Sequence, residues 1–401
     1  FNKVFFSQTG NGTTALILSY MSFAIGYIAG PFGAIFFGHI GDRKGRKVTM
    51  YASLLMMGIS TSIIGILPPA ASAGVGVVIV LQLMRLAQCF GRGGTWGGGI
   101  LMAYENVPEN KRSFYAAIPQ IGLPIGFGLS SILIAVPTLL LPEDIFFTWG
   151  WRIPFLAAII LTVIVIRQKG EMMETEDYKK AQAKLEAEEA EGKKHKVGFI
   201  PMVKGYWKTL LLGCGTRWVD GTFYNIFIVW ILSYCINWLG MPLIQTYIIT
   251  IIACIFKIPF TLFGGWCAQK LGNTRTFVIG ALASAVLSIP TLKVIELSKG
   301  NLAITIIGIV LGWSIAYNLI WAVISSLWSS YFETEVRYSG ISFVYHVPSF
   351  LVAGMVPTIC TLLINYGKGN TIYVGIYSTV VALISAACAL ALKVRHDRGE
   401  K

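Results

Sequence analysis

The sequence predicts an all-α integral membrane protein built from two pseudo-symmetric six-helix bundles, and three observations support this prediction. First, 55% of the 401 residues are hydrophobic and only 13% are charged, whereas soluble proteins carry about 25% charged residues. Second, apolar runs long enough to cross a bilayer recur along the whole chain. Third, a charged motif recurs half-way along the chain, as an internal repeat would place it.

Each long apolar run is interpreted as a membrane span, because a helix needs about 20 apolar residues to cross the hydrocarbon core. This criterion predicts eleven spans: 13–37, 48–69, 76–104, 113–138, 150–167, 206–236, 242–267, 276–295, 302–331, 339–364 and 370–393. An odd number would leave Phe1 outside the cell with no signal peptide to bring it there. We therefore expect that one N-terminal span is missing from this chain and that the intact protein has twelve. An eleven-span protein with an external N-terminus is the alternative.

The loops between the spans indicate the orientation. The segment Gly38–Lys47 holds four cations and one aspartate, and the loops on its side also contain Lys111, Arg337 and the basic C-terminal tail. Because cytoplasmic loops are enriched in Lys and Arg, we expect these loops and the C-terminus in the cytoplasm. The protein would then be a multi-pass protein of the cell (plasma or inner) membrane. We also expect Gly41 and Gly45 to permit a sharp turn in this segment.

Residues 168–205 differ from the rest of the chain, since they are rich in Glu, Lys and Ala and lack a membrane-length apolar run. We interpret them as a cytoplasmic linker. The predicted organisation is therefore an N-terminal bundle (1–167, lacking its first span), this linker, and a C-terminal six-helix bundle (206–401).

The two predicted halves resemble each other in sequence. Gly265–Arg275 matches Gly38–Arg46 at an offset of 227 residues (265 − 38), and Arg337 matches Arg112 at an offset of 225 (337 − 112). Parallel repeats of six spans that enclose a site near the membrane midplane are typical of transporters.

The segment Gly38–Lys47 resembles the signature Gly-x-x-x-Gly-Asp-Arg-x-Gly-Arg-Arg/Lys of the major facilitator superfamily. Four further stretches resemble its metabolite:H⁺ symporter branch, which includes shikimate, α-ketoglutarate and proline/betaine permeases: Arg85–Gly98, Tyr115–Gly122, Gly150–Phe155 and Val336–Gly340. The likeness runs from the first residues to the tail. It implies the major facilitator fold and proton-coupled transport.

The chain departs from the pattern of that branch at several positions. Thr95 stands where a Glu is usual, and Gln269 and Asn273 stand where Asp and Arg are common. The segment Ser330–Glu333 replaces the usual Glu-x-Phe-Pro. The loss of two carboxylates calls the family's standard gating and coupling arrangement into question for this chain.

Charged side chains inside spans are candidate functional groups, because each costs at least ~2.5 kcal/mol to insert. Five such residues occur: Arg85, Arg92, Arg217, Asp220 and Lys257. Arg85 and Arg92 are seven residues apart, so they share a helix face at about 10 Å along the axis. Arg85 should lie near mid-membrane, where its guanidinium can bind a carboxylate with two hydrogen bonds. A structural ion pair is the alternative for Arg85, while Arg92 either reaches the interface or pairs with a gating residue.

The excess of four cations over one anion favours an organic anion, such as a mono- or dicarboxylate, as the substrate. A zwitterion such as a betaine is the second choice, since it needs one carboxylate clamp and an aromatic face for its cation. The predicted substrate-binding residues are Arg85, Gln88, Arg217, Tyr224, Lys257 and Tyr317. Trp230 and Trp321 are further aromatic candidates, although aromatic residues in spans are more often packing residues.

Proton coupling requires a group whose protonation competes with an ion pair. Asp220 is the first candidate, because it lies three residues after Arg217 on the same helix; a permanent structural pair is the alternative. His346 is the second candidate, although a single His in an apolar run is more often a packing residue.

Gating is predicted for the charged segment itself. Asp42, Arg43 and Arg46 are expected to hold the cytoplasmic side closed through hydrogen bonds to neighbouring helix ends. Their expected partners in the corresponding turns are Glu105, Arg112 and Arg337. The alternative is that these charges only fix the orientation.

Several functions are excluded. The net charge of +13 comes from cations in loops rather than from a clustered basic face, so no nucleic-acid partner is expected. The seven cysteines are scattered singly, without metal-ligand spacing. The glycines of Gly93–Gly99 lack the Gly-Lys-Ser/Thr ending of a phosphate loop, and we interpret them as a surface where helices approach closely. We expect no cofactor or metal and no enzymatic activity.

The leading hypothesis is a proton-coupled symporter of a small organic acid or zwitterion that works as a monomer by alternating access. The second is a proton-coupled exporter of drugs or metabolites. The third is a membrane receptor or scaffold that has kept the fold and lost transport.

Overall fold

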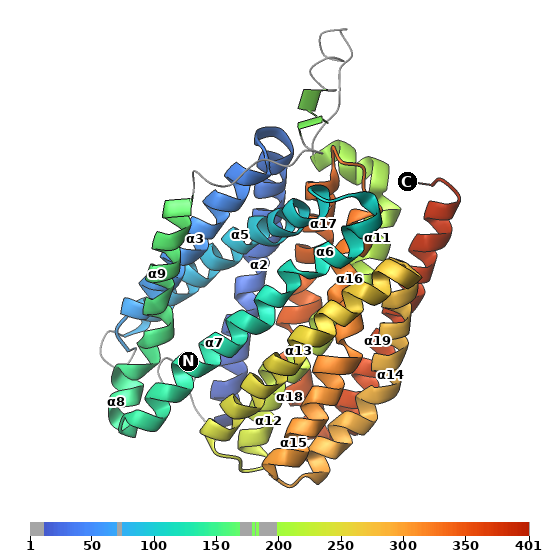
Figure 1. Ribbon diagram of the computed structural model, residues 1–401. Coiled ribbons are helices and arrows are strands. Elements are labelled where there is room, and N and C mark those ends of the chain that lie inside the picture. Colours follow the sequence, from blue (N-terminus) through green and yellow to red (C-terminus); the bar gives the residue numbers. More distant parts are fainter. Residues whose placement is uncertain (1–11, 70–73, 169–178, 181, 184–198, 401) are drawn as a thin grey trace.

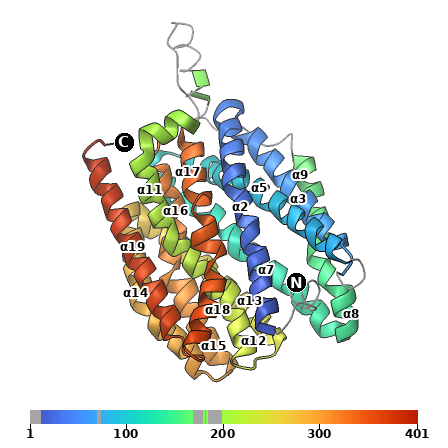
Figure 2. The same cartoon turned by 180° about the vertical axis from the view of Figure 1, so that it is seen from behind.

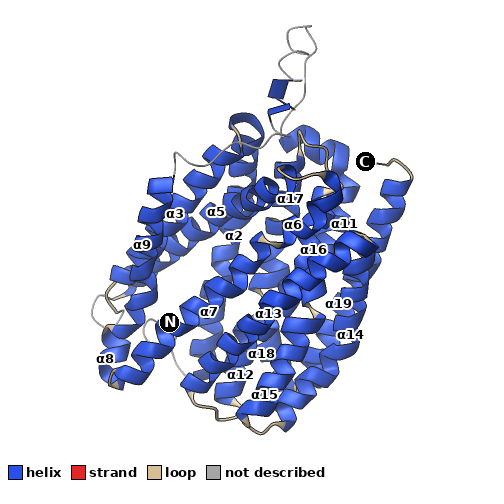
Figure 3. Ribbon diagram, viewed as in Figure 1, coloured by secondary structure: helices blue, strands red, loops and turns tan. Residues whose placement is uncertain are grey.

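A computed structural model describes residues 12–69, 74–168, 179–180, 182–183 and 199–400 (Figure 1). These residues form helices and connecting loops, with no strand among them (Figure 3). The helices of the first half of the chain are α2 (Gly12–Lys44), α3 (Arg46–Ile66), α5 (Val75–Glu105), α6 (Arg112–Ala117), α7 (Gly122–Leu140), α8 (Glu143–Thr148) and α9 (Ile153–Arg167). Those of the second half are α11 (Phe199–Tyr224), α12 (Ile231–Asn237), α13 (Leu243–Leu271), α14 (Asn273–Leu297), α15 (Leu302–Ile309), α16 (Asn318–Ser329), α17 (Arg337–His346), α18 (Val356–Tyr366) and α19 (Ile372–Asp397).

Ten helical stretches within the described ranges are long and apolar enough to cross a membrane, and they coincide with ten of the eleven predicted spans. The remaining predicted span, 76–104, corresponds to α5, which has 31 residues and a length of about 46 Å. It falls short of the apolar criterion because its sequence contains Arg85, Arg92 and a run of glycines. Outward-facing residues such as Leu140 (75% exposed) and Val286 (72%) are apolar, as a lipid environment requires. The protein is a multi-pass membrane protein.

Helices of each half pack mainly on one another. In the first half α5 packs against both α2 and α3, and α9 covers α3; in the second half α14 and α11 pack against α19. The halves meet where α2 contacts α17 and where α13 contacts α6 and α7. In Figures 1 and 2 the C-terminal end of α19 lies at the same end of the molecule as the start of α17.

Most of the predicted linker, 168–205, lies outside the described residues. Helix α11 already begins at Phe199, but its backbone is irregular at Tyr206 (φ −117°, ψ 19°). The predicted start of the C-terminal bundle at residue 206 therefore coincides with a kink rather than with a helix end.

The internal repeat is visible in the backbone. Gly45 (φ 102°, ψ 158°) separates α2 from α3, and Gly272 (φ 90°, ψ 151°) separates α13 from α14. Both lie in a region that favours glycine. Lys111 (φ −121°, ψ −5°) and Val336 (φ −122°, ψ 3°) likewise precede α6 and α17 with nearly the same geometry. The repeat offsets of the sequence thus correspond to repeated local structure.

Only one of the two glycines predicted to make the first turn does so. Gly45 has the positive φ, whereas Gly41 stays inside α2. A Cβ on Gly41 would lie 2.9 Å from the ring of Tyr338. Gly41 is therefore required for the approach of α17 and not for the turn.

Three π-helical segments interrupt the spans of the second half: Asn225–Trp230, Val310–Ala316 and Phe350–Gly354. Such segments are rare and are often found at functional sites. Each lies next to a candidate residue. Tyr224 precedes the first segment, Tyr317 follows the second, and His346 lies four residues before the third, with Pro348 between them.

Candidate functional site

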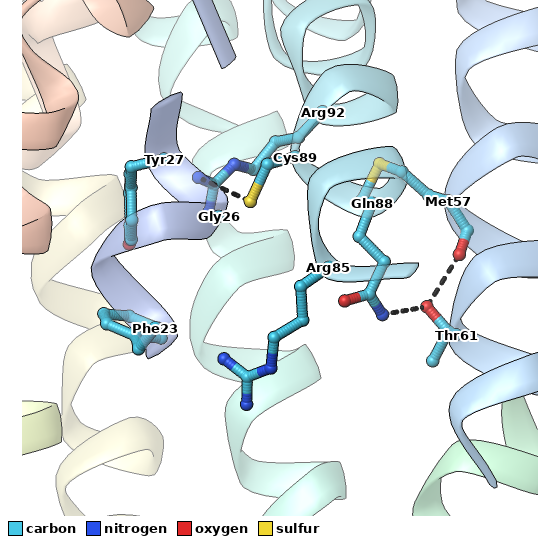
Figure 4. Close-up of a pocket in the computed structure, with 9 residues that line it drawn as sticks. All are labelled: Phe23, Gly26, Tyr27, Met57, Thr61, Arg85, Gln88, Cys89 and Arg92. Carbon is cyan, nitrogen blue, oxygen red and sulfur yellow. Dashed lines mark hydrogen bonds between the residues drawn. The ribbon is translucent and has the colours of Figure 1, made fainter. Parts of the chain in front are cut away.

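A cavity of about 220 Å³ lies among α2, α3 and α5 (Figure 4). It is lined by Phe23, Gly26, Tyr27, Met57, Thr61, Arg85, Gln88, Cys89 and Arg92. The side chain of Arg85 lines the cavity and points away from Thr61, with the rings of Phe23 and Tyr27 on one side of its guanidinium (Figure 4). Of the predicted substrate-binding residues, the structure brings Arg85 and Gln88 to this cavity.

Neighbouring side chains hold Gln88 and Arg92 in place at the cavity. The Nε2 atom of Gln88 donates to Oγ1 of Thr61 at 2.7 Å, and Oγ1 of Thr61 donates to the carbonyl of Met57 at 2.6 Å. Arg92 lies over the ring of Tyr27, 4.5 Å from its centre, and donates to Sγ of Cys89 at 3.5 Å. One wall of the cavity therefore combines hydrogen-bonding groups with two guanidinium groups.

A second group of candidate residues is buried among the C-terminal helices. Arg217 forms an ion pair with Oδ2 of Asp220, and the hydroxyl of Tyr317 donates to Oδ1 of the same carboxylate. Asp220 is 1% exposed and Arg217 4%. Because breaking a buried ion pair is costly, neutralising Asp220 would leave the buried guanidinium of Arg217 without its carboxylate partner.

Lys257 of α13 completes this charge cluster, which we define as Arg217, Asp220, Lys257 and Tyr317. Lys257 is fully buried, and its Nζ lies over the rings of Trp313 (4.4 Å to the centre) and Tyr317 (4.3 Å). Within the described part of the chain Nζ has no hydrogen-bond acceptor. Tyr317 thus contacts Asp220 through its hydroxyl and Lys257 through its ring face.

The charge cluster does not line the cavity as the structure describes it, and neither do the other aromatic candidates. Tyr224 packs edge-to-face on Phe127 of α7, with ring centres 5.6 Å apart. Trp230 is buried against Tyr234, and the indole nitrogen of Trp321 donates to the carbonyl of Gln120 at 3.0 Å. In this conformation these aromatic side chains make packing and hydrogen-bond contacts, and their assignment to substrate binding stays a prediction.

His346 lies between the two halves. It is 1% exposed, and a Cβ on Gly30 of α2 would lie 3.3 Å from its Nδ1. Its ring packs edge-to-face on Tyr345, with ring centres 4.8 Å apart. His346 therefore lies where α2 meets α17. Among the described contacts, no hydrogen bond joins it to Asp220.

Four of the six predicted gating residues, Asp42, Arg46, Glu105 and Arg337, gather where α2, α3 and α5 meet α17. Asp42 accepts hydrogen bonds from the backbone nitrogen of Ser339 at 3.3 Å and from its hydroxyl at 2.5 Å. Ser339 lies in the first turn of α17, where the helix dipole favours a carboxylate. Asp42 is 6% exposed, so this bond across the halves is shielded from water.

Glu105 joins two arginines from different halves at the same place. Its Oε1 lies 3.1 Å from Nη1 of Arg337, and its Oε2 lies 3.7 Å from Nε of Arg46. Arg46 also contacts Asp42 at 3.4 Å and donates to the carbonyl of Thr334 at 3.1 Å. We call the set Asp42, Arg46, Glu105, Arg337 and Ser339 the first junction.

Two predicted gating residues stand apart from the first junction. Arg112 contacts the exposed Glu109 at 3.7 Å, donates to the carbonyl of Val107 at 3.4 Å and lies over the ring of Tyr104. These described contacts are with the end of α5 and with the turn that follows it. The side chain of Arg43 lies outside the described residues.

A second junction, formed by Asn110, Phe114 and Gln269, joins the halves at the repeated position. Oε1 of Gln269 accepts a hydrogen bond from the backbone nitrogen of Phe114 at 3.3 Å, and Nε2 donates to the carbonyl of Asn110. In the sequence, Gln269 stands where an Asp is common in the family that the chain resembles, which called that family's standard gating arrangement into question. In the structure the amide oxygen occupies the acceptor position, so the junction forms without the charge.

Comparison with known proteins identifies the family. The family model described as "Major Facilitator Superfamily" matches residues 6–353. The chain belongs to the Major Facilitator Superfamily. Members of this family are transporters and not enzymes, in agreement with the prediction from the motifs.

Individual relatives agree with this assignment. The chain is 34% identical to the inner membrane metabolite transport protein YhjE of Escherichia coli (strain K12), over 99% of this chain and 89% of that protein. It is 30% identical to the shikimate transporter of the same strain, over 98% and 88%. A solved structure of the proton:xylose symporter XylE, bound to 6-bromo-6-deoxy-D-glucose, has a TM-score of 0.76 at 16% identity and covers 97% of this chain and 88% of that one. At that identity the likeness to XylE shows the fold alone.

Sequence reasoning missed several residues of the site. Tyr27, Thr61 and Cys89 line the cavity, but only Cys89 had a signal, since it lies on the helix face shared by Arg85 and Arg92. Tyr345 was also missed. It contacts both halves, yet nothing in its local sequence distinguishes it from a packing residue.

Proposed function

We propose that this protein is a proton-coupled symporter of a small organic acid or zwitterion, working by alternating access. The observation that carries the proposal is the position of Arg85, whose side chain lines a cavity together with those of Arg92 and Gln88. A guanidinium binds a carboxylate with two parallel hydrogen bonds. Two guanidinium groups on one wall suit a substrate with at least one carboxylate.

The chemistry of the remaining wall narrows the substrate class. Phe23 offers an aromatic face beside the guanidinium of Arg85, whereas the ring of Tyr27 is already contacted by Arg92. Gln88 and Thr61 offer neutral hydrogen-bonding groups. A hydroxylated carboxylic acid would use both kinds of contact. A zwitterion would place its cation on an aromatic face and its carboxylate on Arg85.

Coupling is assigned to Asp220. Its carboxylate is shared by Arg217 and Tyr317 and is separated from Lys257 by one aromatic ring. Protonation of Asp220 would release Arg217, and the cluster would then hold one more positive charge. Binding of an anionic substrate would compensate this added positive charge, so reorientation would be favoured when both the substrate and the proton are bound. His346 is the alternative proton carrier.

We further propose that the first and second junctions face the cytoplasm. Arg46, Lys111 and Lys270 all lie at or next to the helix ends that form the two junctions. The positive-inside rule favours a cytoplasmic position for such cations. The junctions would then be closed, and the cavity would be loaded from the opposite side of the inner membrane. A monomer contains every group used in this mechanism.

Uptake into proteoliposomes tests the proposal. Labelled mono- and dicarboxylates, with betaine as the zwitterionic probe, are offered under a proton gradient directed inward. Accumulation that a protonophore abolishes supports symport. Extrusion under the same gradient would make the protein an exporter, and binding without flux of any probe would overturn transport altogether.

A further inference from the structure

The ring of Tyr345 in α17 is held between the two halves of the protein. On one side the indole of Trp96 in α5 stacks on it, with ring centres 4.1 Å apart and an interplanar angle of 20°. The guanidinium carbon of Arg217 in α11 lies 4.2 Å from the centre of the same ring. Because the stacked indole covers one face of the Tyr345 ring, the guanidinium of Arg217 lies on the opposite face. We call the rings of Trp96 and Tyr345 the aromatic stack. Together with the guanidinium of Arg217 it crosses the boundary between the halves.

Other contacts hold Trp96 in the stack. Trp328 of α16 packs on Trp96, with ring centres 5.5 Å apart, and its indole nitrogen donates to Oγ1 of Thr216 at 2.8 Å. Trp96 is therefore inserted into a site formed by the second half of the chain. A Cβ on the adjacent Gly97 would lie 2.8 Å from Oγ of Ser342, so this glycine allows α5 to approach α17.

The aromatic stack lies between the cavity and the first junction. Along α5 the cavity is lined by residues 85–92, Trp96 follows, and Glu105 of the first junction ends the helix. With a rise of 1.5 Å per residue, Trp96 is about 6 Å beyond Arg92, and Glu105 is about 14 Å beyond Trp96. Along α17 the order is reversed, from Arg337 and Ser339 to Tyr345. Any solute passing from the cavity towards the first junction meets the stack first.

Arg217 connects this stack to the charge cluster. Its Nη1 binds Asp220, and its Nε donates to the backbone carbonyl of Tyr345 at 3.3 Å. The same guanidinium thus holds the ring and the backbone of Tyr345 while it is paired with Asp220. Pro348 interrupts the helix three residues later and has no amide hydrogen to donate. The carbonyl of Tyr345 also accepts a hydrogen bond from the hydroxyl of Ser349, so Arg217 is one of two described side chains that hold this end of α17.

We propose that Tyr345 is a positioning residue in the gate that closes the cavity towards the first junction, and that the Arg217–Asp220 pair sets its position. Neutralising Asp220 removes the partner that holds Arg217. The ring of Tyr345 then loses the support on its second face, and Trp96 can leave. This inference rests on the proposed function, because it treats Asp220 as the group whose charge changes during transport.

The accessibility of Cys89 tests the inference without requiring transport. Cys89 lines the cavity, so a membrane-impermeant thiol reagent added to either side of oriented proteoliposomes reports which side is open. A Cys89→Ser variant measures the background from the other cysteines. In the unchanged protein we expect labelling only from the side opposite the first junction.

Tyr345→Leu removes the stack, and labelling from the side of the first junction should then rise by about tenfold, the scale expected from losing an aromatic pair and a cation–π contact. Tyr345→Phe keeps the ring and should label like the unchanged protein. Trp96→Leu should act like Tyr345→Leu and replaces it if that variant does not fold. Asp220→Asn should shift labelling in the same direction.

Three results would overturn the inference. They are unchanged labelling in both leucine variants while they remain folded, unchanged labelling in Asp220→Asn, and a shift in Tyr345→Phe as large as in Tyr345→Leu. Failure of the proposed function is distinguishable from each of these results. It would appear as absent uptake in the unchanged protein, whatever the labelling pattern.

Discussion

Asp42 and Gln269 make the same contact at equivalent positions in the two halves. Oδ2 of Asp42 accepts from the backbone nitrogen of Ser339 at 3.3 Å, and Oε1 of Gln269 accepts from that of Phe114 at 3.3 Å. Both acceptors end a helix that is followed by a glycine turn, and both donors lie near the start of a helix in the other half. The two junctions therefore share geometry but differ in charge.

The charged junction should depend on the charge of Asp42. Asp42→Asn keeps an acceptor for Ser339 but removes the carboxylate that also contacts Arg46. Charge-assisted hydrogen bonds are roughly twice as strong as neutral ones. We expect more frequent opening at this end, measured as faster labelling of Cys89 from the side of the first junction. Labelling that stays at the unchanged rate would show that the carboxylate is not needed for closure.

The neutral junction should respond differently. Gln269→Glu keeps the acceptor for Phe114 but loses the donor to the carbonyl of Asn110, so we expect labelling of Cys89 to rise by less than it does when both bonds are lost. Gln269→Ala removes both bonds and should increase labelling from the same side, since each lost bond is worth about 1 kcal/mol. The ratio of the two effects separates the acceptor role from the donor role. Equal effects of both variants would argue against the acceptor role.

Glu105 should be the residue of the first junction on which stability depends most. It is fully buried as a side chain and is shared by Arg46 and Arg337. Glu105→Gln deprives two buried cations of their common carboxylate, and removing one partner of a buried ion pair typically costs about 3–5 kcal/mol. Thermal unfolding in detergent should show a clear decrease in Tm. Glu109→Gln is the matched control, because the Glu109 side chain is 90% exposed; a similar decrease in both variants would contradict the assignment.

Gly33 of α2 should be required for the packing of α2 against α5, whereas Gly99 of α5 should not. A Cβ on Gly33 would lie 2.0 Å from the carbonyl oxygen of Phe90, whereas a Cβ on Gly99 would have no atom within 4 Å. Gly33→Ala should push α2 away from α5, with a cost of about 1–3 kcal/mol. Gly99→Ala should leave the protein as stable or slightly more stable, since alanine favours helices. Tm measurements on both variants decide the matter, and equal Tm values would refute the close contact.

The helical fold was predictable from the sequence because its determinants are local. Length and apolarity define the spans, and the repeat offsets anticipated the matching turns at Gly45 and Gly272. The role of Gly41 was not predictable. Its requirement comes from Tyr338, almost 300 residues away in sequence, and a helical glycine and a turn glycine look the same in a sequence pattern.

The candidate site was predictable only in part. Arg85 and Gln88 were identified because charged and amide groups inside a span are costly and therefore noticeable. The separation of the charge cluster from the cavity could not be predicted, since it depends on how α11 and α13 pack. Tyr345 shows the same limit, because its importance comes from Trp96 and Arg217 on two other helices.

The binding of an organic acid to the protein and to its Arg85→Ala variant tests the central claim most directly. Isothermal titration with the acid that gives the strongest uptake would be compared for the unchanged protein, Arg85→Ala and the exposed-site control Arg398→Ala. Losing a charged hydrogen-bonding partner costs about 1.5–3 kcal/mol, so Kd should rise at least tenfold in Arg85→Ala and stay unchanged in Arg398→Ala. An unchanged Kd in Arg85→Ala would contradict the assignment of the cavity as the substrate site.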